Sequence, residues 1–263
     1  MSLLDRFLPP SRPPGTLTFR CNVCGDVRDV EVSRLSREVS SCSCGSTVRM
    51  RGVVRVLSLE LFGRSMPIAE FPQRKDLEGV GLSDWEGYAQ RLARKLTYRN
   101  TYLHKEPRLD ITAIDGYAPH ALDFIISSDV FEHVPPPVGR AFENAHTLLK
   151  PGGLLVLTVP YHGEPGTKTL EHFPELHEFE LVTENGRRQL RNTTRDGRRE
   201  VFDDLCFHGG EGETLEMRVF AEESLREDLA RAGFKDVKIH GEPDFAHGIY
   251  WTQSWSLPIS ARA

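Results

Sequence analysis

The sequence predicts an α/β protein, in which a mostly parallel sheet is flanked by helices and preceded by a small metal-binding module. Two observations lead to this fold class: a strand–helix–strand pattern over residues 121–161 and two close cysteine pairs within residues 16–50. The length of 263 residues and the 39% hydrophobic content allow a sizeable core. We therefore expect one large domain with a small N-terminal module.

The strand–helix–strand pattern is the clearest signal. Residues 122–127, LDFIIS, form a continuous apolar run that is typical of a strand buried on both faces of a parallel sheet. A helix is predicted after Pro135, with Phe142 and Ala145 on its apolar face. Residues 151–153, PGG, end this helix, and LLVLTVP follows as the second buried strand. Short connections of this kind indicate a parallel crossover.

Four cysteines form the two close pairs. Cys21 and Cys24 stand in CNVCG, and Cys42 and Cys44 stand in CSCG. Two thiolate pairs brought together by a hairpin give the tetrahedral set that zinc prefers, as in a zinc ribbon. The second pair has C-x-C spacing where C-x2-C is more usual, and the alternative is that the cysteines are incidental. We expect a structural zinc ion, because four protein ligands leave no open coordination position.

The chain divides into segments of different character. Residues 1–15 contain four prolines and are predicted to form an extended arm. Residues 16–50 form the zinc-ribbon-like module, and residues 51–263 form the α/β domain. An insert at about 163–218 has no place in a minimal sheet. Cys206, within this insert, is expected to be a buried apolar thiol.

Charge and hydropathy exclude several classes of partner. Lys plus Arg is 33 and Asp plus Glu is 38, for a net charge of −5, whereas a protein that binds phosphate backbones is usually basic. No stretch approaches the roughly 18 apolar residues of a membrane span, and the N-terminal sequence lacks the pattern of a secretory signal. We expect a soluble cytoplasmic protein with neither a nucleic-acid nor a membrane partner.

The segments DFIISSDVFEHVPPP and LLKPGGLLVLTVPY resemble the fourth strand, fourth helix and fifth strand of class I S-adenosylmethionine-dependent methyltransferases. The resemblance covers about residues 66–260. Its flanking parts are GVGLSDWEGYAQRLARKL as the second strand with its helix, PRLDIT as the third strand, FAEESLREDLARAGFKDVKIHG as the late helix and sixth strand, and WSLPIS as the seventh strand. It implies a Rossmann-like class I methyltransferase sheet with S-adenosylmethionine as cofactor.

The chain departs from this family at the first strand. Family members have a first strand that ends in an acidic residue and a Gly-x-Gly loop, which lets the cofactor approach the backbone. Here residues 68–71 would be that strand and Glu70 its acidic end, but no glycine loop follows. Gly79 and Gly81 would instead open the second strand. The first strand and its helix are therefore expected to be reduced or modified.

The resemblance implies that four acidic residues bind the cofactor: Glu70, Asp84, Asp110 and Asp129. Asp84 would accept hydrogen bonds from the ribose hydroxyls, and its alternative role is a helix cap before WEGYAQRL. Asp110 matches the spacing of the adenine-side residue, with a solvated turn as its alternative. Asp129 would lie on the methionine side of the pocket, with a strand-end polar residue as its alternative.

Histidines are the candidates for proton transfer. Methyl transfer to a hydroxyl requires removal of the hydroxyl proton, and imidazole is the usual base at neutral pH. His162 directly follows the fifth strand and is expected to be the catalytic base, with His133 ranked second. His172, His177 and His208 are expected to bind the acceptor, or only to form hydrogen bonds within the insert.

The function predicted by the resemblance is methyl transfer from S-adenosylmethionine to a hydroxyl of a small molecule or glycan. The alternative is a methyltransferase-like protein with lost or altered cofactor binding, which serves as a binding or assembly module or performs different chemistry. Arginines at positions 187, 188, 191 and 198 flank a predicted hairpin turn, NTTRDG. They form either a solvated strand pair or a site for an acidic acceptor.

Overall fold

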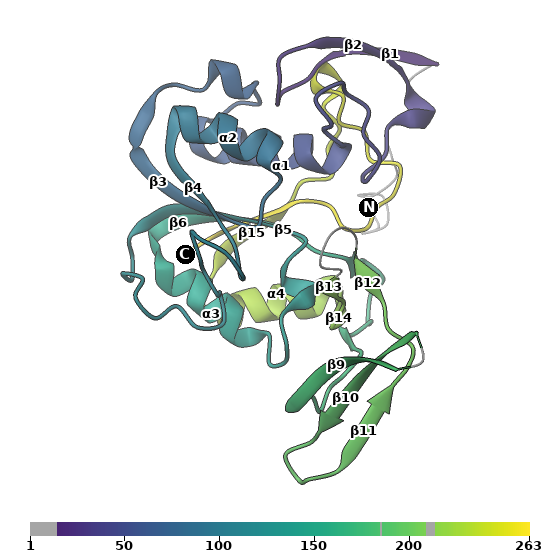
Figure 1. The fold of residues 1–263 in the computed structure, drawn as a ribbon. Helices are drawn as coiled ribbons and strands as arrows, with labels where there is room; N and C mark the ends of the chain where they lie inside the picture. The colour runs from purple at the N-terminus through teal and green to yellow at the C-terminus, as the bar shows by residue number, and fades with distance from the viewer. Residues whose placement is uncertain (1–14, 185, 209–213) are drawn as a thin grey trace.

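The computed structural model describes residues 15–184, 186–208 and 214–263, so most of the expected arm lies outside the described residues. A six-stranded sheet of order β15-β16-β6-β5-β3-β4 forms the centre (Figure 1). Its strands are β3 (Arg74–Leu82), β4 (Leu96–Thr101), β5 (Leu122–Ser128), β6 (Leu149–Thr158), β15 (Lys235–Ile239) and β16 (Ile259–Arg262). Strands β3 to β6 are mutually parallel, whereas β16 is antiparallel to both β6 and β15.

Helices cover both faces of this sheet. In the described part of the chain the α-helices are α1 (Val48–Phe62), α2 (Glu86–Lys95), α3 (Gly139–Leu148) and α4 (Glu222–Arg231). Figure 1 shows α1 and α2 on one side of the sheet and α3 and α4 on the other. The crossovers β3–α2–β4 and β5–α3–β6 confirm the α/β class and the predicted strand–helix–strand unit. Within the described residues, no helix combines the length and apolar character needed to span a membrane.

The central strands carry the core. Phe124, Ile125 and Ile126 of β5 are fully buried, as are Leu154 and Val156 of β6. Burying each such side chain contributes about 1.5–3 kcal/mol relative to exposure, which explains why these two continuous apolar runs lie at the centre of the sheet.

The prediction of a first strand at residues 68–71 is wrong. Ile68–Glu70 form a 3-10 turn, and β3 is the first strand of the main sheet. Strand β3 lies between β4 and β5 and leads directly into α2, so Asp84 follows the first strand and not the second. The loop at residues 83–85 therefore occupies the position expected for the glycine loop.

The predicted third strand is also reduced. Residues 102–121 connect β4 to β5, and within this connection Arg108 makes a single parallel bridge to Tyr102. Asp110 forms an isolated antiparallel bridge with Ala113. A full strand and helix are thus replaced by turns at this end of the sheet.

The N-terminal module is a β-hairpin whose turn carries Cys21 and Cys24, followed by a second turn that carries Cys42 and Cys44. Its elements are β1 (Thr16–Arg20), β2 (Val27–Glu31) and a 3-10 turn (Val32–Arg34). Thr47 then begins α1, because its side chain accepts a hydrogen bond from the backbone amide of Met50 at 3.4 Å. The module and the sheet share one hydrophobic core.

The insert adds small sheets and a projecting arm (Figure 1). The arm consists of β9 (Glu178–Glu184), β10 (Arg187–Thr193) and β11 (Arg199–Phe202), all antiparallel. The shorter strands are β7 (Tyr161–His162), β8 (Leu170–Glu171), β12 (Phe207–His208), β13 (Thr214–Leu215) and β14 (Arg218–Ala221). Phe173, Leu190, Leu215 and Met217 form a separate small core.

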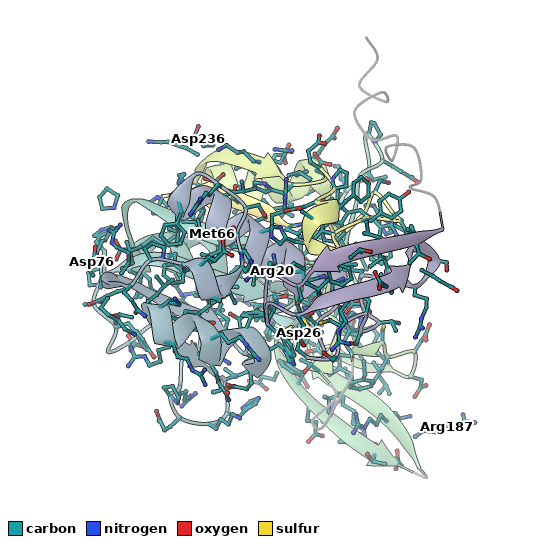
Figure 2. All side chains as sticks on the ribbon, turned by 90° about the horizontal axis from the view of Figure 1, so that it is seen from above. Arg20, Asp26, Met66, Asp76, Arg187 and Asp236 are labelled. Carbon is teal, nitrogen blue, oxygen red and sulfur yellow. The ribbon has the colours of Figure 1, made fainter. Side chains whose placement is uncertain are left out.

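The hairpin turn predicted at NTTRDG is confirmed. Thr193 of β10 pairs with Arg199 of β11, and Gly197 between them has a φ of +87°, which favours glycine. Figure 2 shows Arg187 at the periphery of the molecule, on the projecting arm.

Candidate functional site

A cavity of about 1480 Å³ opens at the carboxyl ends of strands β3, β4, β5 and β6. The N-terminal module and α1 form one wall, and the insert forms another. Four sequence-predicted residues line this cavity: Asp110, Asp129, His133 and His208. This is the edge at which open α/β sheets bind their ligands.

Asp129 follows β5 and binds two arginines from the N-terminal part of the chain. Its Oδ1 lies 2.8 Å from Nη2 of Arg37 and its Oδ2 lies 3.1 Å from Nε of Arg49. Thr158, at the end of β6, donates a further hydrogen bond of 2.7 Å to Oδ1. Asp129 thus joins the N-terminal module to the edge of the sheet, a contact that sequence reasoning did not predict.

Electrostatics hold Asp129 in its charged form. Burial alone would raise the pKa of this carboxyl, but the attraction of Arg49 and Arg37 outweighs that effect and lowers the pKa to about 2. The side chains of Arg37 and Arg49 are only 15% and 17% exposed, so solvent screens these pairs weakly.

Asp84 takes neither of its predicted roles. The cap position of α2 is Trp85, and Asp84 is buried among protein groups rather than lining the cavity. Its carboxylate accepts a hydrogen bond from Tyr98 and fills the space beside Gly81, where a Cβ would approach Oδ2 of Asp84 to 2.3 Å. Burial raises the pKa of Asp84 to about 7, against the lowering effect of the hydrogen bond from Tyr98.

Two backbone amides of the loop after β3 are already hydrogen-bonded. The amide of Ser83 donates to the carbonyl of Thr101 at 2.7 Å, and the amide of Asp84 donates to Oδ1 of Asn100 at 2.8 Å. These two amides therefore cannot serve a ligand as the amides of an open glycine loop would.

Asp110 stands on the cavity wall beside the connection from β4. Its Oδ1 accepts hydrogen bonds from the backbone amide and the hydroxyl of Thr112, at 2.9 and 2.6 Å. Both bonds reach the same oxygen and fix the orientation of the carboxylate. Tyr102 and Ile111 line the cavity next to it.

The remaining predicted residues lie away from the cavity lining. Glu70 pairs with Arg20 at the surface. His162 is exposed on β7, where it pairs with Ala221 of β14, and His177 is exposed in the insert. The structure therefore does not bring His162, ranked first as the base, to the cavity wall. Cys206 is exposed rather than buried, contrary to expectation.

The arginines of the arm do not line the cavity either. Arg191 pairs with Glu184, and Arg198 pairs with Glu175 and Glu200. The Arg188 guanidinium lies 4.8 Å from the ring centre of Phe207. The arm is thus a three-stranded sheet with its own ion pairs.

Imidazoles and carboxylates gather where the end of β5 meets the insert. Nε2 of His208 lies 2.8 Å from Oε2 of Glu216, and Nε2 of His172 lies 2.9 Å from Oε1 of the same carboxylate. The rings of His133 and His208 contact edge to face at 5.2 Å between centroids. Burial lowers the pKa of His133, so its imidazole is neutral at neutral pH.

Glu132, beside His133, is fully buried in the 3-10 turn Phe131–His133. Burial and the nearby charge of Asp129 raise its pKa well above the ordinary value. Sequence reasoning missed Glu132 and Glu216, although Glu132 lies in the quoted segment SSDVFEHV. Glu216 could not be found in this way, because its partners come from distant segments.

The four cysteines of the N-terminal module form a cluster that could bind a metal ion. The four Sγ atoms all lie within 4.8 Å of one another, and those of Cys21 and Cys44 are 3.9 Å apart. Gly25 and Gly45 follow the two pairs with φ of +88° and +91°, which closes each turn. The C-x-C spacing of the second pair therefore does not prevent clustering.

The buried guanidinium of Arg51 lies beside this cluster. Arg51 is fully buried and donates to the carbonyl of Ser46 at 2.9 Å and to the carbonyl of Gly248 at 2.9 Å. Hydrogen bonding to Cys44 and burial raise the pKa of Cys21 to about 12 without a metal. A divalent cation would stabilise the thiolates, and Arg51 would offset the remaining negative charge.

Replacing Asp129 by Asn tests the contact between the module and the sheet. We expect a loss of about 3–5 kcal/mol in the free energy of unfolding at pH 7, because two partly buried arginines lose their counter-ion. The folded-state pKa is depressed, so the stabilisation is present above the unfolded pKa of about 4 and disappears as the pH falls towards 2. Urea unfolding at several pH values measures the difference.

The control for this experiment is Asp76→Asn, which removes an exposed pair with Arg74. This control should leave the urea midpoint unchanged. Equal stabilities of Asp129→Asn and the wild type at pH 7 would contradict the assigned role of Asp129.

Comparisons with known proteins agree with this architecture. Residues 68–239 match the family model described as a methyltransferase domain. No curated protein matches the chain. Among solved structures, an S-adenosylmethionine-dependent methyltransferase from Mesorhizobium loti is 18% identical, with a TM-score of 0.39, and the match covers 74% of this chain and 94% of that one.

Two further solved structures are similar at a comparable level. An amino pentose methyltransferase from Micromonospora echinaspora is 14% identical, with a TM-score of 0.45 and coverage of 83% and 92% of the two chains. A 1,6-didemethyltoxoflavin-N1-methyltransferase from Burkholderia thailandensis is 16% identical, with a TM-score of 0.40 and coverage of 81% and 77%. Because residues 68–239, more than half of the chain, match this family model, the chain belongs to the methyltransferase-domain family, and its central sheet is of the class I type.

Proposed function

We propose that this protein transfers a methyl group from S-adenosylmethionine to a hydroxyl of a small-molecule or glycan acceptor. The observation that carries this proposal is the cavity at the carboxyl edge of the sheet, with a wall of imidazoles and carboxylates. Its volume of about 1480 Å³ exceeds the about 300–1,000 Å³ of a typical ligand pocket. Cofactor and acceptor can therefore occupy it together.

The charges at the end of β5 suit the zwitterionic methionine end of the cofactor. Arg37 and Arg49 supply cations, and Glu38 and Asp129 supply carboxylates, all on the cavity wall. Because the amides of Ser83 and Asp84 are engaged with β4, these side chains would replace the glycine loop in binding this end of the cofactor. The N-terminal module would then be part of the cofactor site.

The opposite part of the cavity suits a nucleoside. Trp85, Tyr102 and Ile111 provide aromatic and apolar surface, and the oriented carboxylate of Asp110 provides an acceptor for an exocyclic amine. S-adenosylmethionine bound in this cavity would supply the methyl group. The bond between that methyl carbon and sulfur would break, and its electron pair would stay on sulfur.

The imidazole and carboxylate cluster would act on the acceptor. As the hydroxyl oxygen forms its new bond to carbon, its proton must leave, and the cluster of His133, His208 and Glu216 provides the group that activates the hydroxyl and takes this proton. Nδ1 of His133 lies 2.9 Å from the carbonyl of Leu215, which orients the ring.

The alternative function, a module that does not bind the cofactor, is favoured by the engaged amides after β3. Calorimetric titration with S-adenosylmethionine distinguishes the two. We expect a dissociation constant in the micromolar range, and Asp110→Ala should weaken binding by about 1–3 kcal/mol through loss of a hydrogen bond to a charged group. Asp115→Ala, an exposed change in the same connection, is the control. Absence of heat at millimolar ligand would favour the alternative.

Replacing His133 by Ala tests the acceptor-activating cluster. Turnover with a hydroxyl acceptor should fall about 100- to 10,000-fold, the usual range for loss of a positioned proton-transfer group. Affinity for S-adenosylmethionine should be unchanged, because the cluster lies on the acceptor side. Single-turnover rates and calorimetry on the same preparation provide the two values. Near wild-type turnover by His133→Ala would show that His133 takes no part in the reaction.

The four-cysteine cluster would hold one structural zinc ion, since its four thiolates leave no open position. The arrangement supports this through the clustered sulfurs, the two glycine turns and the buried Arg51.

Replacing Cys24 by Ser should lower the zinc content by one equivalent and unfold the N-terminal module while the sheet stays folded, because the ion is the main cross-link of a small hairpin. Elemental analysis and hydrogen exchange measure the two effects. Ser43→Ala, an exposed change between two of the cysteines, is the control and should retain zinc. Purified protein without zinc, or full zinc content in Cys24→Ser, would contradict the site.

A further inference from the structure

A second group of metal-ligating side chains lies apart from the cysteines, between the end of β5 and the insert. One ligand atom each of Glu132, His133 and His208 lies within 4.8 Å of the other two. We propose that these three residues bind a divalent transition-metal cation that activates the acceptor hydroxyl. The ion site stands on its own geometry, whereas its part in catalysis rests on the proposed methyl transfer.

Glu132 is the observation that points to a cation. The residue is fully buried, and neither carboxylate oxygen has a hydrogen-bond partner in the described part of the chain. A buried carboxylate without a hydrogen-bond donor is costly, because its oxygens lose their hydration without a partner in exchange. The nearest ring nitrogen is Nε2 of His133, at 3.8 Å from Oε1. A cation between these groups would supply the missing partner.

The hydrogen bonds of both histidines prepare them as ligands. A proton on Nδ1 of His133 is donated to the carbonyl of Leu215 at 2.9 Å, which leaves the lone pair of Nε2 available. Glu216 lies 2.8 Å from Nε2 of His208 and so orients the second ring. Such outer partners are the usual support of imidazole ligands on metal ions.

The ligand types select the class of ion. Two imidazole nitrogens with one carboxylate favour Mn²⁺, Fe²⁺, Co²⁺ or Zn²⁺ over Mg²⁺ and Ca²⁺, which prefer oxygen. Ligand distances of about 2.0–2.2 Å require the three side chains to close in slightly from their present separation. Three protein ligands leave coordination positions open.

An open position would face the cavity, because His133 and His208 line it. The acceptor hydroxyl would bind there, and coordination would lower its pKa. Its proton would pass to Glu216, its oxygen would form the bond to the methyl carbon, and the carbon–sulfur bond would break with the electron pair remaining on sulfur. His133 would then act through the cation rather than as the base.

Mn²⁺ is the probe that separates this site from the four-cysteine cluster, because it binds thiolates weakly and does not displace zinc. The full chain with zinc retained is titrated with Mn²⁺, and loss of the free Mn²⁺ signal is followed by electron paramagnetic resonance. We expect one equivalent to bind. His208→Ala and Glu132→Gln should weaken binding by about tenfold or more. His162→Ala, an exposed histidine outside the cavity lining, should bind as the wild type does.

Folded wild-type protein that takes up no Mn²⁺ at millimolar concentration would overturn the site, as would equal binding by wild type and His208→Ala. His208 is about one-third exposed, so its replacement keeps the test valid if Glu132→Gln does not fold.

Two further measurements separate this inference from the proposed function. Mn²⁺ binding to His133 and His208 in a protein that does not bind S-adenosylmethionine would support the ion site and overturn methyl transfer. Methyl transfer that is unchanged after removal of the second ion, with zinc content constant, would overturn the role of the cation and leave the methyltransferase intact.

Discussion

The contact of Asp129 with Arg37 and Arg49 determines how the two parts of the molecule fit together. The arginines flank the second cysteine pair in the sequence, and Asp129 directly follows β5. A carboxylate buried at this position requires counter-charges, and Arg37 and Arg49 supply them. Docking of the module, the position of α1 and the shape of the cavity therefore depend on one another, so a change in the cysteine cluster alters the cavity wall through these ion pairs.

This dependence gives the altered first loop a physical explanation. In the family pattern, open backbone amides after the first strand receive the cofactor, whereas here the amides of Ser83 and Asp84 bind β4. These bonds make the loop rigid, and they leave the amides of Ser83 and Asp84 unable to donate to a ligand. If the cofactor binds as proposed, Arg37 and Arg49 bind its methionine end in place of the backbone amides. Charged side chains then do what main-chain groups do in the family pattern.

Local sequence patterns predicted the parts of the fold that depend on local interactions. The strand–helix–strand unit, the arm hairpin and the cysteine cluster follow from neighbouring residues, and all three are present. Residues 68–71 resemble a strand because three of the four are apolar, yet Pro67 and Pro72 flank them and limit strand pairing. Asp129 and His133, which follow β5, and Asp110, in the connection after β4, line the cavity, whereas Glu216 meets its histidines only through packing of the insert.

The position of β16 has a consequence for the route by which the chain folds. Ile259 of β16 pairs with Leu157 of β6 and with Ile239 of β15, so the strand latest in the chain closes the sheet across the whole insert. The arm strands pair with near neighbours and can form early, whereas closure by β16 joins distant segments and is the slower event. Until closure, β6 presents the open edge that β16 later covers, and this buried apolar strand is then exposed to intermolecular strand pairing.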